Sequence, residues 1–427
     1  MFPPGARSRL LPVSVPMRYF GAAVAFQVFA WALLLAAPEP LSAFRGGLGP
    51  VFAALHAATL GVLAVAAVGA SLQMLPVATR QPVRSIAAAK LAWWLLVPGL
   101  LLFTSAAAAY RPQLMAAGAA AAFIALAIYG WLLFENLRHA RGMPAIRAYG
   151  WAALACLALA LALGVSLVAH CEFGMALDRR AFAAAHLVLA SYGFLGLLAL
   201  GFSCFLLPMF ALAPPPSERG TLIALAACVG AIALALAAIA LRREGLLALA
   251  AAIGCGGALV HVVMIERSLR TRLRPPLGSA FLLVRVSWFC LLASLALAAA
   301  LALGVAPERA QVLFGVLLVP GWLLTFLLAV LQRIVPFLAS VHAGGRAPAR
   351  VSSMTPERTL GAHRILHLCA LAALVGGVTF AADWLAQLGA AIGLAAAIAY
   401  GAFFVAVMLR LRGAHSDGRA DVLQSTN

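Results

Sequence analysis

Acidic side chains are scarce in this sequence of 427 residues, which contains 12 Asp and Glu against 30 Lys and Arg. All charged residues together make up 10% of the chain, whereas soluble domains contain about 25%. Hydrophobic residues make up 65%, compared with roughly 45–50% in soluble proteins. Because a chain so poor in charge cannot cover a soluble surface, the composition predicts an integral membrane protein.

Cysteine motifs are also absent. The seven cysteines form no CxxC or CxxCH, which argues against thiol redox chemistry and covalent haem attachment. Carboxylates are missing from the middle of the apolar runs, where proton-coupled carriers usually need a titratable group. These absences disfavour a redox-active dithiol protein and a proton-driven pump.

What remains is a series of twelve apolar runs. A helix of about 20 residues crosses a hydrocarbon core of about 30 Å, and backbone groups in lipid must be hydrogen-bonded internally. The sequence therefore predicts an all-α polytopic membrane protein with about 12 transmembrane helices in one membrane domain, 1–427. The expected spans are 17–37, 51–77, 86–108, 114–136, 147–170, 182–212, 218–241, 245–265, 279–304, 310–340, 363–385 and 386–410.

Three of these spans share a pattern of small residues and proline. Gly61, Gly193 and Gly321 align, at steps of 132 and 128 residues, and each is followed fifteen residues later by a proline. Such long-period self-similarity is the signature of a repeated structural unit. The other aligned residues are Gly69, Gly201 and Ala329 at the eighth position and Pro76, Pro208 and Pro336 at the fifteenth.

The repeat predicts three four-helix units around a pseudo-threefold axis. Their expected limits are about 17–136, 147–265 and 279–410. The remaining residues, 411–427, are polar, and we expect them to form a disordered cytoplasmic tail.

Basic residues are unevenly divided between the connections. With the N-terminus in the cytoplasm, 21 Arg and Lys lie on the inner side and seven on the outer side. This asymmetry follows the positive-inside rule and predicts a bacterial inner-membrane protein with both termini in the cytoplasm. The net charge of +18 is then a topology signal, so the lipid bilayer is the expected partner and nucleic acid is not.

Two histidines lie a few residues inside the outer ends of glycine-bearing spans, His56 and His186. Ionisable groups within membranes usually face the bundle interior, and an imidazole nitrogen can ligate a metal or haem iron. A hydrogen bond to a neighbouring carbonyl is the alternative. At the end of the fifth span, His170, Cys171 and Glu172 could join His186 in one metal site.

Three further histidines occupy the expected inner ends of spans. His363 and His367 stand four residues apart on one helix face, and a helical HxxxH can bind metal. No carboxylate other than Glu357 is near them in sequence to complete a metal site, so packing is the preferred interpretation. His261, one turn before Glu266, is expected to be a packed, hydrogen-bonded histidine.

The architecture resembles subunit I of the haem-copper oxidase superfamily, which has twelve helices in three units and a histidine near the outer end of the second helix. The stretch that starts at His56 is similar to the NnrS family, whose members are haem- and copper-containing membrane proteins linked to nitric oxide metabolism. In that pattern the histidine is followed by Gly61, Gly69 and Pro76 at plus five, thirteen and twenty. The resemblance implies that His56 ligates haem and that His186 is the nearest match to a copper ligand.

Other parts of the family pattern are missing. Spans 218–241 and 310–340 contain no histidine, although the family carries copper and haem ligands there. Tyr192 stands six residues after His186, where many members have a tyrosine at four. The resemblance therefore implies haem binding in respiratory or nitrogen-oxide metabolism, beside respiratory or denitrification partners, without a complete copper-containing catalytic centre.

Two alternatives and one question stay open. A twelve-helix secondary transporter is one alternative, although transporters usually show two six-helix halves. A cofactor-free assembly subunit is the other. Whether the protein is an enzyme is not decided by the sequence.

Overall fold

The computed structural model describes residues 11–273, 278, 280–307, 309–343 and 349–425. Among these residues there is no strand, and twelve helices are long and apolar enough to cross a membrane, which confirms the predicted all-α polytopic fold. The spanning helices are α1 (Ser14–Leu35), α2–η3–α3 (Pro50–Thr79), α4 (Ile86–Ala108), α5 (Pro112–Arg138), α6 (Pro144–Phe173), α7–η4–α8 (Arg179–Ala211), α9 (Glu218–Ala240), α10 (Glu244–Arg270), α11 (Ala280–Ala302), α12–η5–α13 (Ala310–His342), α15 (Glu357–Thr379) and α16 (Asp383–Ser425).

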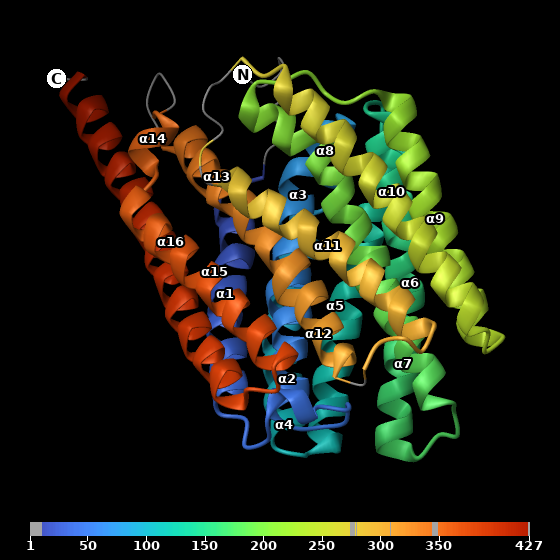
Figure 1. Ribbon diagram of the computed structural model, residues 1–427. Helices are drawn as coiled ribbons and strands as arrows, with labels where there is room; N and C mark the ends of the chain where they lie inside the picture. The colour runs from blue at the N-terminus through green and yellow to red at the C-terminus, as the bar shows by residue number, and fades with distance from the viewer. Residues whose placement is uncertain (1–10, 274–277, 279, 308, 344–348, 426–427) are drawn as a thin grey trace.

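The helix α1 begins and α16 ends at the same end of the bundle, while α2, α4 and α7 mark the opposite end (Figure 1). We call the first the basic end, because its connections hold most of the Arg and Lys residues. The helix α16 continues to Ser425, through most of the segment 411–427 that was expected to be disordered. Four arginines counted on this side lie outside the described residues: Arg7, Arg9, Arg274 and Arg346.

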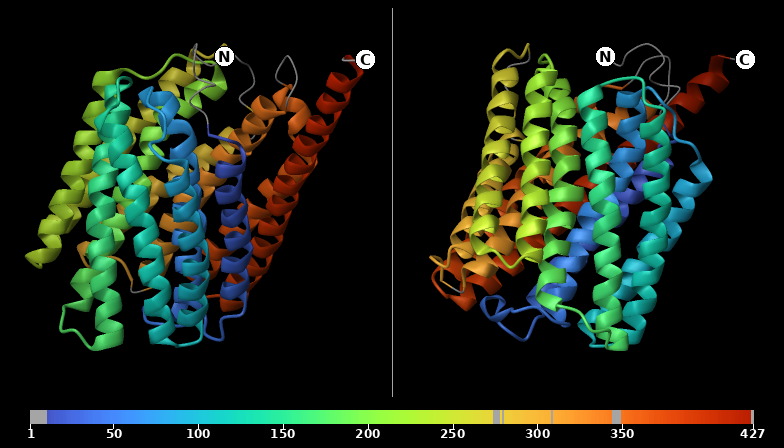
Figure 2. Two further views of the ribbon diagram at one scale, coloured as in Figure 1. Left: turned by 180° about the vertical axis from the view of Figure 1, so that it is seen from behind. Right: turned by 90° about the vertical axis from the view of Figure 1, so that its right-hand side faces the viewer.

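The helices pack in a pattern that repeats three times, and Figure 2 shows the resulting single bundle from two further sides. In each group of four, the third and fourth helices form a hairpin: α4 with α5, α9 with α10, and α15 with α16. The fourth helix also packs along the first helix of the next group: α5 on α6, α10 on α11, and α16 on α1. The last contact closes a ring, which confirms the pseudo-threefold arrangement, while the unit limits 17–136, 147–265 and 279–410 stay predictions.

The second helix of each group contains a π-helical segment. The three segments are η3 (Ala57–Ala64), η4 (Val188–Gly196) and η5 (Leu317–Leu324), and η5 contacts both of the others. Each segment ends three residues after its aligned glycine. Because π-helices are rare and occur mostly as single turns, often at functional sites, the glycine repeat is also a repeat of uncommon backbone geometry.

The aligned glycines allow the second helix of each group to approach the first. A Cβ atom on Gly61 would lie 2.5 Å from the ring of Phe26, and one on Gly193 would lie 2.7 Å from the Cβ of Cys156. Small residues permit this closeness between membrane helices, so the repeated glycines are packing residues. The equivalent contacts are Gly321 with Cys290, Gly69 with Tyr19 and Gly201 with Tyr149.

A buried cross-helix hydrogen bond also recurs. The Tyr129 hydroxyl on α5 donates to Ser71 at 3.1 Å, and 132 residues later His261 on α10 bonds to Ser203 at 2.8 Å. The Ser203 hydroxyl donates to the Leu200 carbonyl, so the Nε2–H of His261 must be the donor in its bond. The structure thus confirms His261 as a packed, hydrogen-bonded histidine.

Candidate functional site

His56 is the last residue of α2 (Pro50–His56), at the end of the bundle opposite to the basic end. Its Nδ1 atom lies 3.0 Å from the carbonyl oxygen of Phe52, so Nδ1–H is the donor and Nε2 keeps its lone pair. The ring packs against Phe52 and Phe103, with centroid distances of 4.1 and 5.4 Å. Within the described chain, no hydrogen-bonding partner faces Nε2.

His186 on α7 (Arg179–Leu187) is held in the same way. Its Nδ1 atom lies 2.9 Å from the carbonyl oxygen of Ala160 on α6, which again leaves Nε2 as an unprotonated nitrogen. Gly164 makes room for the ring, because a Cβ there would come within 3.2 Å of the imidazole Cε1. No described residue bonds to Nε2 of His186.

The two imidazoles belong to different groups of the repeat, His56 on α2 and His186 on α7. Arg179 precedes His186 by seven residues, which places it on the same face of α7. Its guanidinium also lies beside the α1–α2 connection, 4.0 Å from where a Cβ on Gly46 would stand. This end of the bundle therefore combines two oriented imidazoles with a cation two helical turns away.

His170 does not join His186 in the described structure. His186 contacts α6 at Ala160 and Gly164, and His170 lies about 9 Å further along the helix axis from Gly164 at 1.5 Å per residue. The exposed ring of His170 bonds instead to the Met175 carbonyl at 2.7 Å. Among the described residues, no three His, Cys, Asp or Glu side chains come together as a metal site, including the expected cluster with Cys171 and Glu172.

Tyr192 serves as a cross-helix contact. Its hydroxyl lies 3.0 Å from Ser294 on α11, and its ring stacks on Trp322 at 5.6 Å. Both aromatic rings border an apolar cavity of about 400 Å³ between α9, α10 and α11, which is otherwise lined largely by alanine and leucine. None of the described residues that line this cavity is a histidine.

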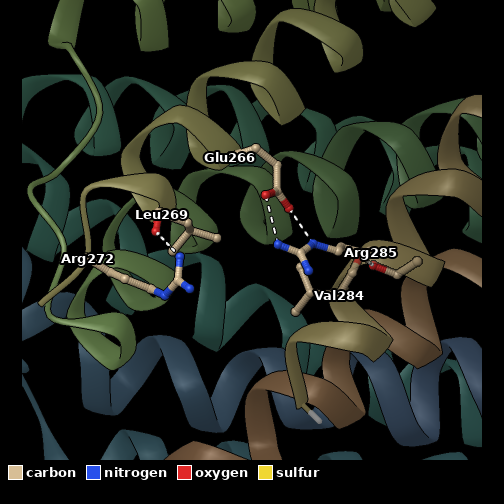
Figure 3. Close-up of polar contacts among 6 residues, drawn as sticks. Glu266, Leu269, Arg272, Val284 and Arg285 are labelled. Carbon is tan, nitrogen blue, oxygen red and sulfur yellow. Dashed lines mark hydrogen bonds and ion pairs between the residues drawn. The ribbon is translucent and has the colours of Figure 1, made fainter. Parts of the chain in front are cut away.

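Two carboxylates near the basic end, Glu266 and Glu135, are ion-paired. Glu266 on α10 accepts two hydrogen bonds from Arg285 on α11, at 2.8 and 3.0 Å (Figure 3). Glu135 lies 3.2 Å from Arg138 on the same helix. The Glu266–Arg285 pair joins the second group to the third, so its role is to connect helices.

Sequence reasoning missed most of the surroundings of His363 and His367. Both side chains are buried in the bundle, and Thr325 and Tyr400, from helices distant in sequence, lie against them. The HxxxH spacing was the available signal, but it carries no information on which helices cover it.

No family model matches this chain, and no curated protein is similar to it. The chain's own geometry therefore has to support any function, and at this end of the bundle it offers His56 and His186, each with Nδ1 bonded to a carbonyl oxygen.

Proposed function

We propose that this chain is a haem-binding integral membrane protein, with His56 as an axial ligand, that works in respiratory or nitrogen-oxide metabolism without a complete catalytic centre. The observation that supports the proposal most directly is the state of two imidazoles. His56 and His186 each commit Nδ1 to a carbonyl oxygen, and each keeps a free Nε2.

The hydrogen bonds and ring contacts of these histidines support haem as the cofactor. Ligating histidines almost always donate their other ring N–H to a carbonyl or carboxylate, which fixes the ring and raises its basicity. The carbonyls of Phe52 and Ala160 have this role for His56 and His186. The phenyl rings of Phe52 and Phe103 supply the apolar contact that a macrocycle requires.

The charged periphery of the site also suits an anionic macrocycle. Arg179 shares a face of α7 with His186, and its guanidinium lies near the α1–α2 connection. A guanidinium is the preferred partner of carboxylates because it donates bidentate hydrogen bonds. We propose that Arg179 binds an acidic substituent of the cofactor at the membrane edge.

Haem, when bound, supplies an iron atom that exchanges single electrons or binds a diatomic gas. The protein's contribution is to orient two imidazoles and to exclude water with aromatic side chains. The helices 218–241 and 310–340 carry no histidine, so the resemblance to haem-copper oxidases does not extend to a second metal centre. Relay, sensing or scavenging is therefore the proposed role, in preference to oxygen reduction.

The twelve-helix transporter is disfavoured by one observation. Transporter folds usually consist of two halves with discontinuous helices at mid-membrane. Here the uncommon geometry occurs in three continuous helices, which contain η3, η4 and η5, one in each group. This supports three units, the arrangement shared with haem-copper oxidase subunit I.

The visible spectrum of the purified protein tests the proposal. Wild type expressed with ample haem should show a Soret band, and His56→Ala should abolish or strongly shift it, because the axial nitrogen is removed. His186→Ala should also change the band. His170→Ala is the matched control, since its ring bonds to the Met175 carbonyl and lies apart from His186.

Two results would contradict the haem proposal. One is a colourless wild type that is folded and membrane-inserted. The other is a Soret band that survives unchanged in both His56→Ala and His186→Ala.

A further inference from the structure

A second pair of histidines lies inside the bundle, on α15. His363 and His367 are 0% and 1% exposed, and their rings stack with centroids 5.6 Å apart and planes 28° apart. Two imidazoles buried this completely, with no carboxylate grouped around them in the described chain, are costly unless every nitrogen is satisfied.

The hydrogen bonds determine the proton position on His363. Its Nδ1 atom lies 3.0 Å from the carbonyl oxygen of Ala396 on α16. A carbonyl can only accept, so Nδ1 carries the proton and donates. The Nε2 atom is then a bare lone pair, and it is buried without any partner among the described residues.

The same reasoning applies to His367. Its Nε2 atom lies 2.7 Å from the hydroxyl of Thr325, and that hydroxyl donates its own hydrogen to the Pro320 carbonyl at 2.8 Å. Thr325 must therefore accept from His367, and Nε2 carries the proton. This leaves Nδ1 of His367 as a second buried lone pair that no described residue reaches.

Two lone pairs in one stacked pair of rings call for an electron-pair acceptor. The nearby hydroxyl of Tyr400 is buried and unpaired as well, with its ring centroid 4.8 Å from that of His363. Buried polar atoms are nearly always satisfied in folded proteins, so three unpaired atoms at one place indicate a group that the chain itself does not supply. Nitrogen lone pairs of imidazole are typical ligands for transition-metal ions.

The charge of the site restricts which ion it can take. Both histidines are neutral, and the desolvation cost of an ion in a low-dielectric interior rises with the square of its charge. A monovalent ion is therefore much easier to accommodate than a divalent one. Copper is the first-row transition metal with a stable monovalent state, and it accepts few ligands in that state.

We propose that His363 and His367 bind a single Cu⁺ ion through Nε2 and Nδ1, respectively. The carbonyl of Ala396 and the hydroxyl of Thr325 orient the two rings, and Tyr400 closes the site on the side of α16. The site shares no residue with the His56–His186 pair and lies on a different helix. Failure of the haem proposal would therefore not contradict the copper site, and failure of the copper site would not contradict the haem proposal.

Copper titration of the purified full-length protein tests this site. Under anaerobic conditions with chelator-buffered Cu⁺, wild type should retain about one copper ion per chain, and Zn²⁺ at equal concentration should not displace it. His363→Gln and His367→Gln should lose this retention. His261→Gln is the matched control, because His261 is equally buried but both of its nitrogens face protein partners.

A milder variant keeps the test valid if a glutamine variant fails to fold. Thr325→Val removes the hydroxyl that orients His367, and it should lower Cu⁺ affinity roughly 10- to 100-fold, as other losses of outer-sphere partners do. Thermal unfolding without copper should show a folded protein.

Three outcomes would overturn the proposal. The first is a wild type that retains no copper. The second is copper retention in both His363→Gln and His367→Gln that equals that of wild type. The third is a site that prefers Zn²⁺ to Cu⁺. The first of these would favour an internal water molecule, donating to both nitrogens, in place of the metal.

Discussion

The histidines of this protein differ in what their second nitrogen can do. His261 uses both ring nitrogens in protein contacts and so has only a structural role. His56 and His186 each keep one free nitrogen. Sequence position predicted this difference from His261, and the atoms that face the second nitrogen of each ring account for it.

A residue-scale prediction concerns the close contact between Gly61 and Phe26. Gly61→Leu should lower the thermal unfolding midpoint markedly, because the new side chain would collide with Phe26, and overpacking costs about 1–3 kcal/mol. Gly230→Leu on α9 is the control, since a Cβ there meets nothing within 4 Å. Equal midpoints for the two variants, by scanning fluorimetry in detergent, would refute the close approach of α1 and η3.

At the scale of elements, the three π-helical segments are the feature that sequence reasoning could not reach. The spacing from glycine to proline is the same in an α-helix and in a helix with a π-segment, so the repeat gave no sign of it. The spans themselves were predictable, as 218–241 against the observed Glu218–Ala240 illustrates. Long apolar runs are a direct consequence of the membrane, whereas hydrogen-bond register depends on packing between the central helices.

The recurring cross-helix hydrogen bond supports an element-scale prediction. Ser203→Ala would leave the Nε2–H of His261 without an acceptor, which should destabilise the protein by about 1–3 kcal/mol. Ser71→Ala should have a similar effect through Tyr129. Ser166→Ala is the control, because the Ser166 hydroxyl bonds only within its own helix. If all three variants changed the thermal unfolding midpoint equally little, the two cross-helix hydrogen bonds would not stabilise the fold.

The start of α7 should depend on pH. The backbone N–H of Ala181, and then the nearby Arg242, lower the pKa of Asp178, which caps the helix. A lowered folded-state pKa means that the cap stabilises α7 above the unfolded pKa of about 3.9 and is lost as the pH falls through the folded value. The protection factors of residues 179–183 against hydrogen exchange, which correct for the intrinsic pH dependence of exchange, should therefore fall in acid in wild type. Asp178→Asn should remove most of this pH dependence, and an unchanged acid response would contradict the cap.

At the scale of the whole molecule, the threefold ring explains why the repeat is visible in sequence. Each central helix must meet the first helix of its own group closely, so Gly61, Gly193 and Gly321 occupy equivalent places. The fold was predictable because this constraint acts three times on one chain. The candidate site was less predictable: His56 and His186 are candidates from the sequence, but the carbonyl of Ala160 that orients His186 lies on another helix, and no local pattern encodes it.

Topology is the prediction that belongs to this scale. The excess of Arg and Lys at the basic end predicts that this end faces the cytoplasm. Reporter fusions after residue 45 should indicate the outside, and fusions after residue 142 should indicate the inside. A cytoplasmic signal at residue 45 would contradict this prediction and mean that the basic end faces the outside.

Cryo-electron microscopy of the purified, haem-supplemented protein tests the central claim most directly. The account predicts a planar density beside α2 and α7, with the Nε2 atom of His56 pointing at its centre and Arg179 at its edge. A map at side-chain resolution with an empty site, or with planar density away from His56, would contradict it.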